Sequence, residues 1–309
     1  MGIGRSVALW AADNRWLRTH LPRYRFVRRS VARFLPGERL EDAMDAAADL
    51  ETKGLTSAFT ELGENVSTEA EASAVSEHYL DAYDLVAERG LDAELSVKPT
   101  HLGLDVDRAI AAGHLDRLAR KAKEHGMWLW LDMESSRYAD PTVDLYRELR
   151  ASHPNTGICL QAYLRRTADD IESLIPFDPS VRLVKGAYKE PPTLLVGGKS
   201  LIDESYRALA LRLLERQRND GRLVLGTHDV DLAMRIERDA EVRGMGRDRF
   251  EIEMLFGIRT ADQLRLAADG YRVRTLIAYG SFWYPWYMRR IAEKPIENSL
   301  LAIRNMLGR

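Results

Sequence analysis

Two adjacent arginines, Arg289 and Arg290, stand near the C-terminal end of the chain in a segment rich in aromatic residues. Each guanidinium group offers a planar set of donors that can bind a carboxylate through two hydrogen bonds. Most such pairs are simply the solvated face of a helix. This pair, however, follows the last strand that we predict, and Pro285 before it suits the first turn of a helix. We therefore interpret it as a candidate clamp for an anionic substrate.

A single lysine, Lys98, ends a short apolar run in the segment Ser-Val-Lys-Pro-Thr. A lysine at a strand end can bind a substrate carboxylate, form a Schiff base as in barrel aldolases, or complete an ion pair. The residues alone leave all three roles open.

Carboxylates and one histidine close other apolar runs. We predict that Asp132 and Glu134 share one face of a strand, where paired carboxylates can do acid–base work or bind a metal. No His-x-His pair stands near a predicted strand end, so we expect no metal site. His228 is the one histidine at such an end, and a lone histidine there is more often structural than catalytic.

The glycine-rich fingerprint of a dinucleotide-binding Rossmann unit is absent from the sequence. A nucleotide cofactor would therefore need another kind of site. Arg182, Lys185 and the backbone of Gly186 could hold its pyrophosphate group or its ring system.

Eight short apolar runs alternate with longer, charged stretches that have helical periodicity. The runs are residues 55–62, 95–98, 128–133, 158–163, 181–188, 223–227, 250–256 and 273–279. Buried parallel strands are continuously apolar because helices cover them, and their alternation with helices indicates βαβ units. Eight units favour a closed (β/α)₈ barrel over an open sheet. The reaction in such a barrel takes place at the carboxyl ends of the strands, where the polar residues above lie.

The composition of the 309 residues is that of a globular protein from a reducing compartment, which indicates the cytoplasm. Hydrophobic residues make up 45% and charged residues 30%, and the formal net charge of −2 gives no sign of a nucleic-acid partner. Cys159 is the one cysteine, so no internal disulfide can form. No apolar stretch is long enough to span a membrane.

The first 53 residues differ from the rest, and we predict two or three helices there, ahead of a barrel domain at residues 54–309. Residues 15–34 mix arginines with aromatic residues, and residues 40–50 have helical periodicity. A basic, aromatic helix can lie on an anionic membrane surface, so peripheral contact with the inner face of a membrane is one interpretation. The other is an arm packed on the barrel wall with its arginines in solvent.

Seven strand-end motifs occur in an order that resembles the proline dehydrogenase family. They are residues 62–64, 96–98, 131–134, 160–163, 182–188, 226–229 and 287–293, of which 182–188 is the most specific. The resemblance extends from about Phe34 to the C-terminus. It implies a distorted (β/α)₈ barrel that binds FAD non-covalently, oxidises L-proline to 1-pyrroline-5-carboxylate and passes electrons to a quinone.

The resemblance also implies roles for individual residues. Arg289, Arg290 and Lys98 would hold the substrate carboxylate, and Glu64 would pair with Arg289 as a gate over the pocket. Asp132 would orient the polar groups on the substrate side. The pocket between substrate and flavin would be lined by Ala187, Tyr188 and Leu255. The flavin ring and ribityl-phosphate region would be contacted by Gln161, Arg182, Val184 and Lys185, and the adenosine side by Thr227 and His228, with Glu293 nearby.

Three positions depart from the pattern of the family. Leu276 stands where a tyrosine usually packs on the substrate, Trp286 replaces a tyrosine three residues before the arginine pair, and Glu253 replaces a glutamine. The lost tyrosine could make room for a substituted proline such as hydroxyproline. A Schiff-base lyase or aldolase that uses Lys98 is a second alternative, and a non-catalytic barrel docked on a membrane is a third.

Overall fold

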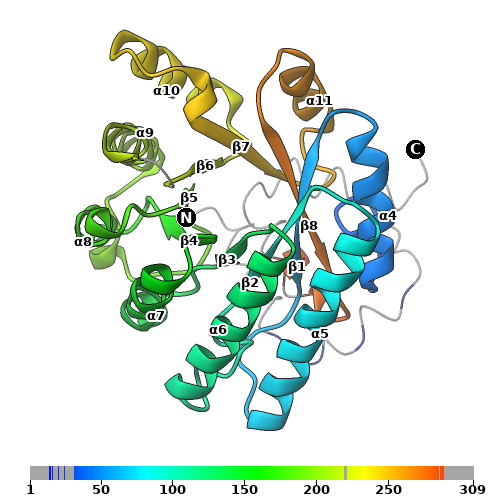
Figure 1. Ribbon diagram of the computed structural model, residues 1–309. Coiled ribbons are helices and arrows are strands. Elements are labelled where there is room, and N and C mark those ends of the chain that lie inside the picture. The colour runs from blue at the N-terminus through cyan, green and yellow to red at the C-terminus, as the bar shows by residue number, and fades with distance from the viewer. Residues whose placement is uncertain are drawn as a thin grey trace.

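A closed barrel of eight parallel strands forms the centre of the molecule (Figure 1). The computed structural model describes residues 31–218, 221–284 and 286–288, together with Asn14, Trp16, His20 and Tyr24. Each strand pairs with the next along the chain, and β8 pairs with β1 to close the barrel. The strands are β1 Thr56–Glu61, β2 Ala93–Val97, β3 Leu129–Leu131, β4 Thr156–Gln161, β5 Val181–Val184, β6 Leu223–Gly226, β7 Phe250–Leu255 and β8 Val273–Tyr279. The expected (β/α)₈ barrel is confirmed, with strand ends that differ from the predicted ones by a few residues.

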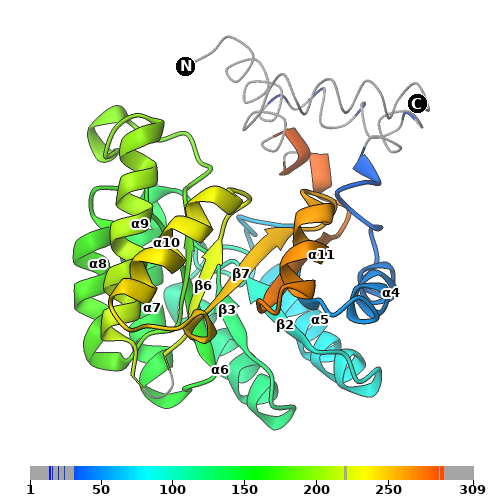
Figure 2. The same cartoon turned by 90° about the horizontal axis from the view of Figure 1, so that it is seen from above.

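Helices lie between successive strands and form an outer ring, which Figure 2 shows from a second direction. They are α5 Glu69–Glu88, α6 Arg108–Glu124, α7 Ala139–Ser152, α8 Thr167–Leu174, α9 Lys199–Arg216, α10 Val230–Val242 and α11 Thr260–Ala268. Short 3₁₀ turns accompany them: η2 Ser136–Tyr138, η3 Ile175–Phe177, η4 Pro192–Leu194 and η5 Arg247–Arg249. Each α-helix turns an apolar face to the sheet. The strand residues that face outward to these helices are apolar, and they account for the apolar character of the predicted runs.

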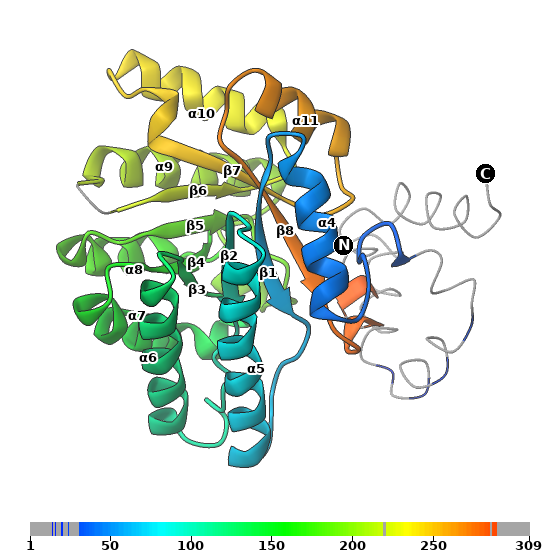
Figure 3. The same ribbon diagram turned by 45° about the vertical axis from the view of Figure 1, so that its right-hand side comes forward.

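Helix α4, Leu40–Glu51, covers the barrel where β1 meets β8 (Figure 3). It places Ala43, Met44 and Ala47 in the same core as the strands. The helix that we predict at residues 40–50 is therefore confirmed. The predicted helices in residues 15–34 fall almost wholly outside the described residues, and the division of the chain at residue 53 stays a prediction. Among the described residues, no helix has the length and apolar character needed to cross a membrane.

The inside of the barrel is charged, although such interiors are usually filled by branched apolar side chains. Alternate strand residues point inward. Among these are five ionic residues that are each more than nine-tenths buried: Glu94, Arg182, Glu251, Glu253 and Arg274. Burying a charge without a partner costs several kcal/mol. Each of these groups is accordingly paired, and the pairs gather at the two ends of the barrel.

Candidate active site

Asp132 lies at the centre of a charged cluster at the carboxyl ends of the strands. Its Oδ1 accepts hydrogen bonds from Ser96 Oγ at 2.7 Å and from Arg182 Nη1 at 3.0 Å. Its Oδ2 lies 3.8 Å from the Nζ atom of Lys98. One carboxylate thus organises two cations that come from β5 and from the end of β2. The structure therefore brings three sequence-predicted residues together, with Lys98 and Arg182 on either side of Asp132.

Arg182 is held inside the barrel by charge on both sides and by an aromatic ring. Its Nε lies 2.9 Å from Oε1 of Glu253, and its guanidinium group packs over the ring of Trp130, 4.9 Å from the centroid. Burial disfavours the charged form, but Glu253 and Asp132 outweigh it and raise the pKa of Arg182. Arg182 is therefore a fixed cation whose position two carboxylates determine.

Glu134 does not share a face with Asp132, so our prediction of paired carboxylates on one strand is wrong. Strand β3 ends at Leu131, and the two acidic residues lie in the loop beyond it. Glu134 turns to Thr100, which donates to its carboxylate from the backbone N at 3.1 Å and from Oγ1 at 2.7 Å. Burial raises the pKa of Glu134 to about 7. Glu134 therefore ties the turn after Lys98 to the loop after β3.

The amide of Gln161, at the end of β4, donates from Nε2 to the backbone carbonyl of Glu134 at 3.2 Å. This bond fixes the orientation of the glutamine side chain and leaves Oε1 as the atom that can accept from elsewhere. The loop after β3 is therefore tied both to the end of β2 and to the end of β4.

Lys185 at the end of β5 lies between two carboxylates. Its Nζ donates to Asp203 of α9 at 2.6 Å and to Asp229 at 2.8 Å. Asp229 also caps α10 by accepting from the backbone N of Leu232. Asp229 belongs to the turn after β6 that holds Thr227 and His228, and its backbone N donates to Thr227 Oγ1 at 3.1 Å. The structure thus places three sequence-predicted residues side by side at the ends of β5 and β6.

A sharp bend after β5 places the segment from Val184 to Tyr188 beside Tyr163, whose backbone N donates to the carbonyl of Lys185 at 3.0 Å. Gly186 has a φ of 114°, which L side chains rarely adopt, and a Cβ there would lie 2.3 Å from the ring of Tyr163. Ala187 and Tyr188, which we predict to line the pocket, are half-buried beyond the bend. Only glycine allows the chain to pass this close to the aromatic ring.

The far side of the mouth is apolar. Leu255 ends β7 and pairs in register with Leu276 of β8. Leu276 lies two residues after Arg274 and so faces the inside of the barrel, where it is half-buried. Leu255 also packs against a second core cluster, of which Trp286 is a member. The departures Leu276 and Trp286 thus lie on the apolar side of the mouth, near the ends of β7 and β8.

Three predicted site residues, Arg289, Arg290 and Glu293, lie outside the described residues. Glu64 is described: it is half-buried in the loop after β1. Its predicted pairing with Arg289 stays a prediction. Within the described part of the chain, no three His, Cys, Asp or Glu side chains are arranged to hold a metal ion.

Sequence reasoning missed several residues that hold the members of this cluster in place. Trp130 and Ser96 lie inside apolar runs, where they look like ordinary strand residues. Asp203 comes from a helix, so no strand-end motif contains it. The position of Thr100, two residues after Lys98, is the one signal that could have led to the bond with Glu134.

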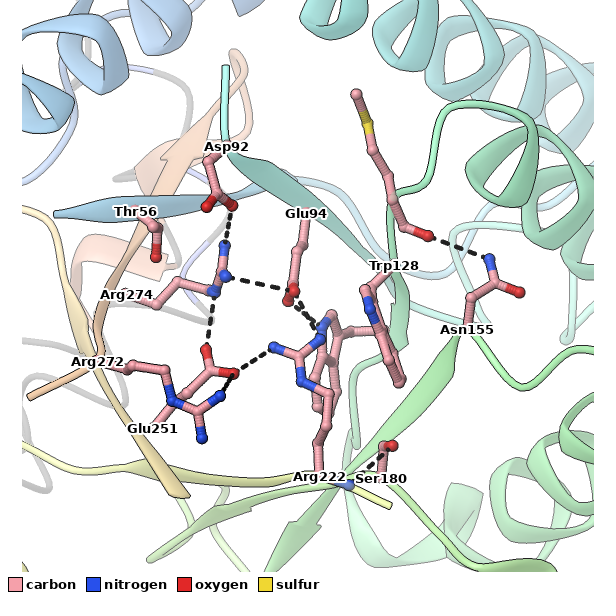
Figure 4. Close-up of polar contacts among 12 residues, drawn as sticks. Thr56, Asp92, Glu94, Trp128, Asn155, Ser180, Arg222, Glu251, Arg272 and Arg274 are labelled. Carbon is pink, nitrogen blue, oxygen red and sulfur yellow. Dashed lines mark hydrogen bonds and ion pairs between the residues drawn. The ribbon is translucent and has the colours of Figure 1, made fainter. Parts of the chain in front are cut away.

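The opposite, N-terminal end of the barrel is closed by a second group of charges (Figure 4). Arg222 lies 2.7 Å from both Glu94 and Glu251, and Arg274 lies 3.4 Å and 3.3 Å from the same two carboxylates. Trp128 packs on the face of Arg222, 4.3 Å from the guanidinium carbon. These charges satisfy one another, so we interpret this group as structural.

An open cavity of about 560 Å³ lies beside this second group, and Arg222 and Glu251 are among its lining residues. We do not assign the reaction to it, because the residues predicted to bind substrate and cofactor gather at the other end of the barrel. Chemistry in barrels of this kind takes place at the carboxyl ends of the strands.

Solved structures with the same fold include a proline utilization A (PutA) protein of Bdellovibrio bacteriovorus, inactivated by N-propargylglycine. It superposes with a TM-score of 0.80 over 94% of this chain at 24% sequence identity. This chain covers 36% of that larger protein. The likeness shows the fold.

Curated relatives match over almost the whole chain. Proline dehydrogenase 1 of Bacillus subtilis subsp. natto is 34% identical over 98% of this chain and 99% of its own length. The proline dehydrogenase of Deinococcus radiodurans is 34% identical over 89% of both chains. A sequence model of the family described as proline dehydrogenase matches residues 43–299. The chain therefore belongs to the proline dehydrogenase family.

Proposed function

We propose that this protein oxidises L-proline to 1-pyrroline-5-carboxylate with a non-covalently bound FAD at the carboxyl ends of the strands. The observation that carries the proposal is the cluster in which Asp132 holds Lys98 and Arg182 at one mouth of the barrel. Membership of the proline dehydrogenase family supports the same substrate.

Buried polar atoms at this mouth fit a flavin. Nη2 of Arg182 and Oε1 of Gln161 are buried and have no hydrogen-bond partner among the described residues. One is a donor and the other an acceptor, and the edge of an isoalloxazine ring offers both complements. The tight bend at Gly186 brings backbone close to the same space. When bound there, FAD supplies the redox chemistry by accepting a hydride from the carbon next to the ring nitrogen of proline.

The side chains of the protein bind and orient the substrate. Lys98, together with the sequence-predicted Arg289 and Arg290, would hold the proline carboxylate and thereby fix the position of the ring carbon that reacts. Asp132 keeps the ammonium group of Lys98 in place. Leu255 and Tyr188 would enclose the ring and exclude water from it. The carboxylate clamp thus determines the orientation, and the apolar side determines which rings fit.

An anaerobic absorbance spectrum tests this function. We expect the purified protein, supplied with FAD, to show flavin absorbance that is bleached by L-proline and not by D-proline.

R289M is expected to raise KM for proline by about thirtyfold or more, since a charge-assisted clamp contributes about 2 kcal/mol. A protein that gains no flavin absorbance, or whose flavin L-proline leaves oxidised, would contradict the proposal. Covalent trapping of substrate on Lys98 by borohydride would instead support the lyase alternative.

Electrons would pass to a quinone, which places the protein at the inner face of a membrane for part of its cycle. The arginines and aromatic residues of residues 15–34 support such contact. Sedimentation with vesicles that contain anionic lipid, compared with neutral vesicles, tests the contact. Reduction of a soluble quinone by proline in the presence of the enzyme tests the acceptor. If the quinone is not reduced, the electron acceptor is not a quinone.

A substituted proline such as hydroxyproline is the second candidate substrate, and Leu276 favours it. Its side chain faces the mouth and is shorter than the tyrosine of the family pattern. We expect L276Y to lower kcat/KM for 4-hydroxyproline about tenfold relative to proline. Equal effects on both substrates would show that Leu276 does not contact the ring substituent.

A further inference from the structure

Glu253 is a buried carboxylate in the middle of β7 that no step above uses. Its side chain is 4% exposed, and Oε1 lies 2.9 Å from Nε of Arg182. The other oxygen, Oε2, is also buried and has no hydrogen-bond partner among the described residues. The carboxylate therefore acts on its surroundings mainly through its charge on Arg182.

Arg182 carries one positive charge but faces two carboxylates. Nη1 binds Asp132 at 3.0 Å and Ser96 at 2.9 Å, while Nε faces Glu253. Asp132 has a second cation, Lys98, within 3.8 Å, whereas Glu253 has Arg182 alone within 4.0 Å among the described residues. Removing the charge of Glu253 would thus leave the group around Arg182 with an additional net positive charge.

The charge of Arg182 matters to a flavin because reduction adds negative charge to the ring. A cation beside the ring stabilises the reduced form, and an anion behind that cation opposes this effect. In a buried site with an effective dielectric constant of about 20, a unit charge about 8 Å away changes an equilibrium constant by about tenfold or more. Glu253 is almost wholly buried, so solvent screens its charge little.

We propose that Glu253 is a positioning residue that lowers the reduction potential of the bound flavin by offsetting the charge of Arg182. This inference rests on the proposed function, in which Arg182 contacts the isoalloxazine ring. It assigns to Glu253 a role in driving force, in addition to its part in holding the guanidinium group in place.

The protonation of Glu253 makes this effect depend on pH. Burial raises the pKa of Glu253 to about 7, against the opposing effect of Arg182 and Arg274, which favour the ionised carboxylate; Glu94 and Asp132 disfavour it. Well below pH 7 the neutral form predominates, resembles glutamine and leaves the charge of Arg182 unopposed. Well above pH 7 the ionised form predominates, and the opposition is largest.

Redox titration of the FAD-loaded protein, followed by absorbance at pH 6 and pH 8.5, tests the proposal. At pH 8.5 we expect E253Q to favour flavin reduction about tenfold, which is about +30 mV for a two-electron couple. At pH 6 the difference should shrink. E253D keeps the charge and should stay closer to the wild type than E253Q does. M254L changes the adjacent, outward-facing residue of β7 without a change in charge, and its potential should equal that of the wild type.

Two results would overturn the proposal. One is equal potentials for E253Q and the wild type at pH 8.5, and the other is a larger shift in E253D than in E253Q, which would indicate a packing effect.

If E253Q does not fold, redox-difference infrared spectra of the wild type at pH 7.5 decide. Flavin reduction should then protonate a buried carboxyl, and the absence of its C=O band overturns the proposal. A protein that binds FAD and is bleached by proline, yet fails these tests, leaves the proposed function intact; one that binds no FAD overturns both.

Discussion

The indole ring of Trp130 fills the space beside Gly157, its register partner on the neighbouring strand. A Cβ on Gly157 would lie 2.3 Å from the ring, so the two residues form one packing unit. The indole N–H donates to Glu94 at 2.6 Å, and the ring face packs on Arg182. Trp130 thus connects the charges at the N-terminal end of the barrel with those of the candidate active site.

The first prediction concerns this unit: G157A should destabilise the protein. The added methyl group has to displace a ring that is fully buried between two charged groups. Overpacking of this kind costs about 1–3 kcal/mol in the free energy of unfolding. Urea unfolding followed by circular dichroism measures it.

G113A is the matched control for that experiment. Gly113 lies inside α6, and a Cβ there would meet nothing within 4 Å. Alanine favours a helix over glycine, so this variant should be about 0.5–1 kcal/mol more stable than the wild type. If G157A were stabilised as G113A is, the ring of Trp130 would not occupy this space.

The second prediction concerns the charges at the N-terminal end of the barrel. E251Q leaves Arg222 and Arg274 with Glu94 as their main shared carboxylate, so it should cost about 3–5 kcal/mol of stability. Burial opposes ionisation of Glu251, but Arg222 and Arg274 outweigh it and lower its pKa. This contribution is therefore present above the unfolded-state pKa of about 4.3 and is lost as pH falls through the folded-state pKa.

Urea unfolding of E251Q and the wild type, at pH 7 and at pH 3.5, measures both parts of this prediction. The difference in free energy should shrink at pH 3.5. The KM for proline at 20 °C should change little in the folded variant, because the cluster lies at the other end of the barrel. A gap that is the same at both pH values would show that the charge of Glu251 is not what stabilises the fold.

The strands could be predicted from the sequence because their outward residues are apolar in unbroken runs. Leu129 and Leu131, for example, both face the helices, so the run around them is a strong signal. The charges inside the barrel could not be predicted in the same way. Glu94, Arg182 and Arg274 each occur singly in different strands, and only closure of the barrel makes them neighbours.

Part of the site could be predicted because the carboxyl ends of all parallel strands in a barrel lie at the same mouth. Lys98 and Asp132 end adjacent strands, so their proximity follows from the parallel order. This arrangement does not give the direction of a side chain beyond the last strand residue. Glu134 turns away from Asp132 for that reason. Partners that come from helices, such as Asp203 for Lys185, carry no strand-end signal at all.

The third prediction is that D132N impairs catalysis. The change removes the charge that holds Arg182 and Lys98 at the mouth of the barrel. Charge-assisted hydrogen bonds contribute about 1.5–3 kcal/mol, so kcat/KM for proline should fall about 10- to 100-fold. S96A removes a neutral donor to the same carboxylate and should cost at most about tenfold. A larger loss in S96A than in D132N would contradict this order.

The fourth prediction concerns Glu134 and runs opposite in pH to that for Glu251. Its pKa is about 7 in the folded protein, mainly because of burial, against about 4.3 in the unfolded chain. The unfolded state therefore releases its proton first, and the stability that depends on this carboxyl, complete below pH 4.3, is lost as pH rises toward 7.

E134Q does not titrate and can still accept from Thr100. Between pH 5 and pH 8 the variant should gain about 3 kcal/mol relative to the wild type in urea unfolding. E77Q, at an exposed ion pair on α5, should show a difference within about 1 kcal/mol across the same range. A constant gap between E134Q and the wild type would mean that Glu134 is ionised in the folded protein throughout, and that Thr100 binds a carboxylate rather than a carboxylic acid.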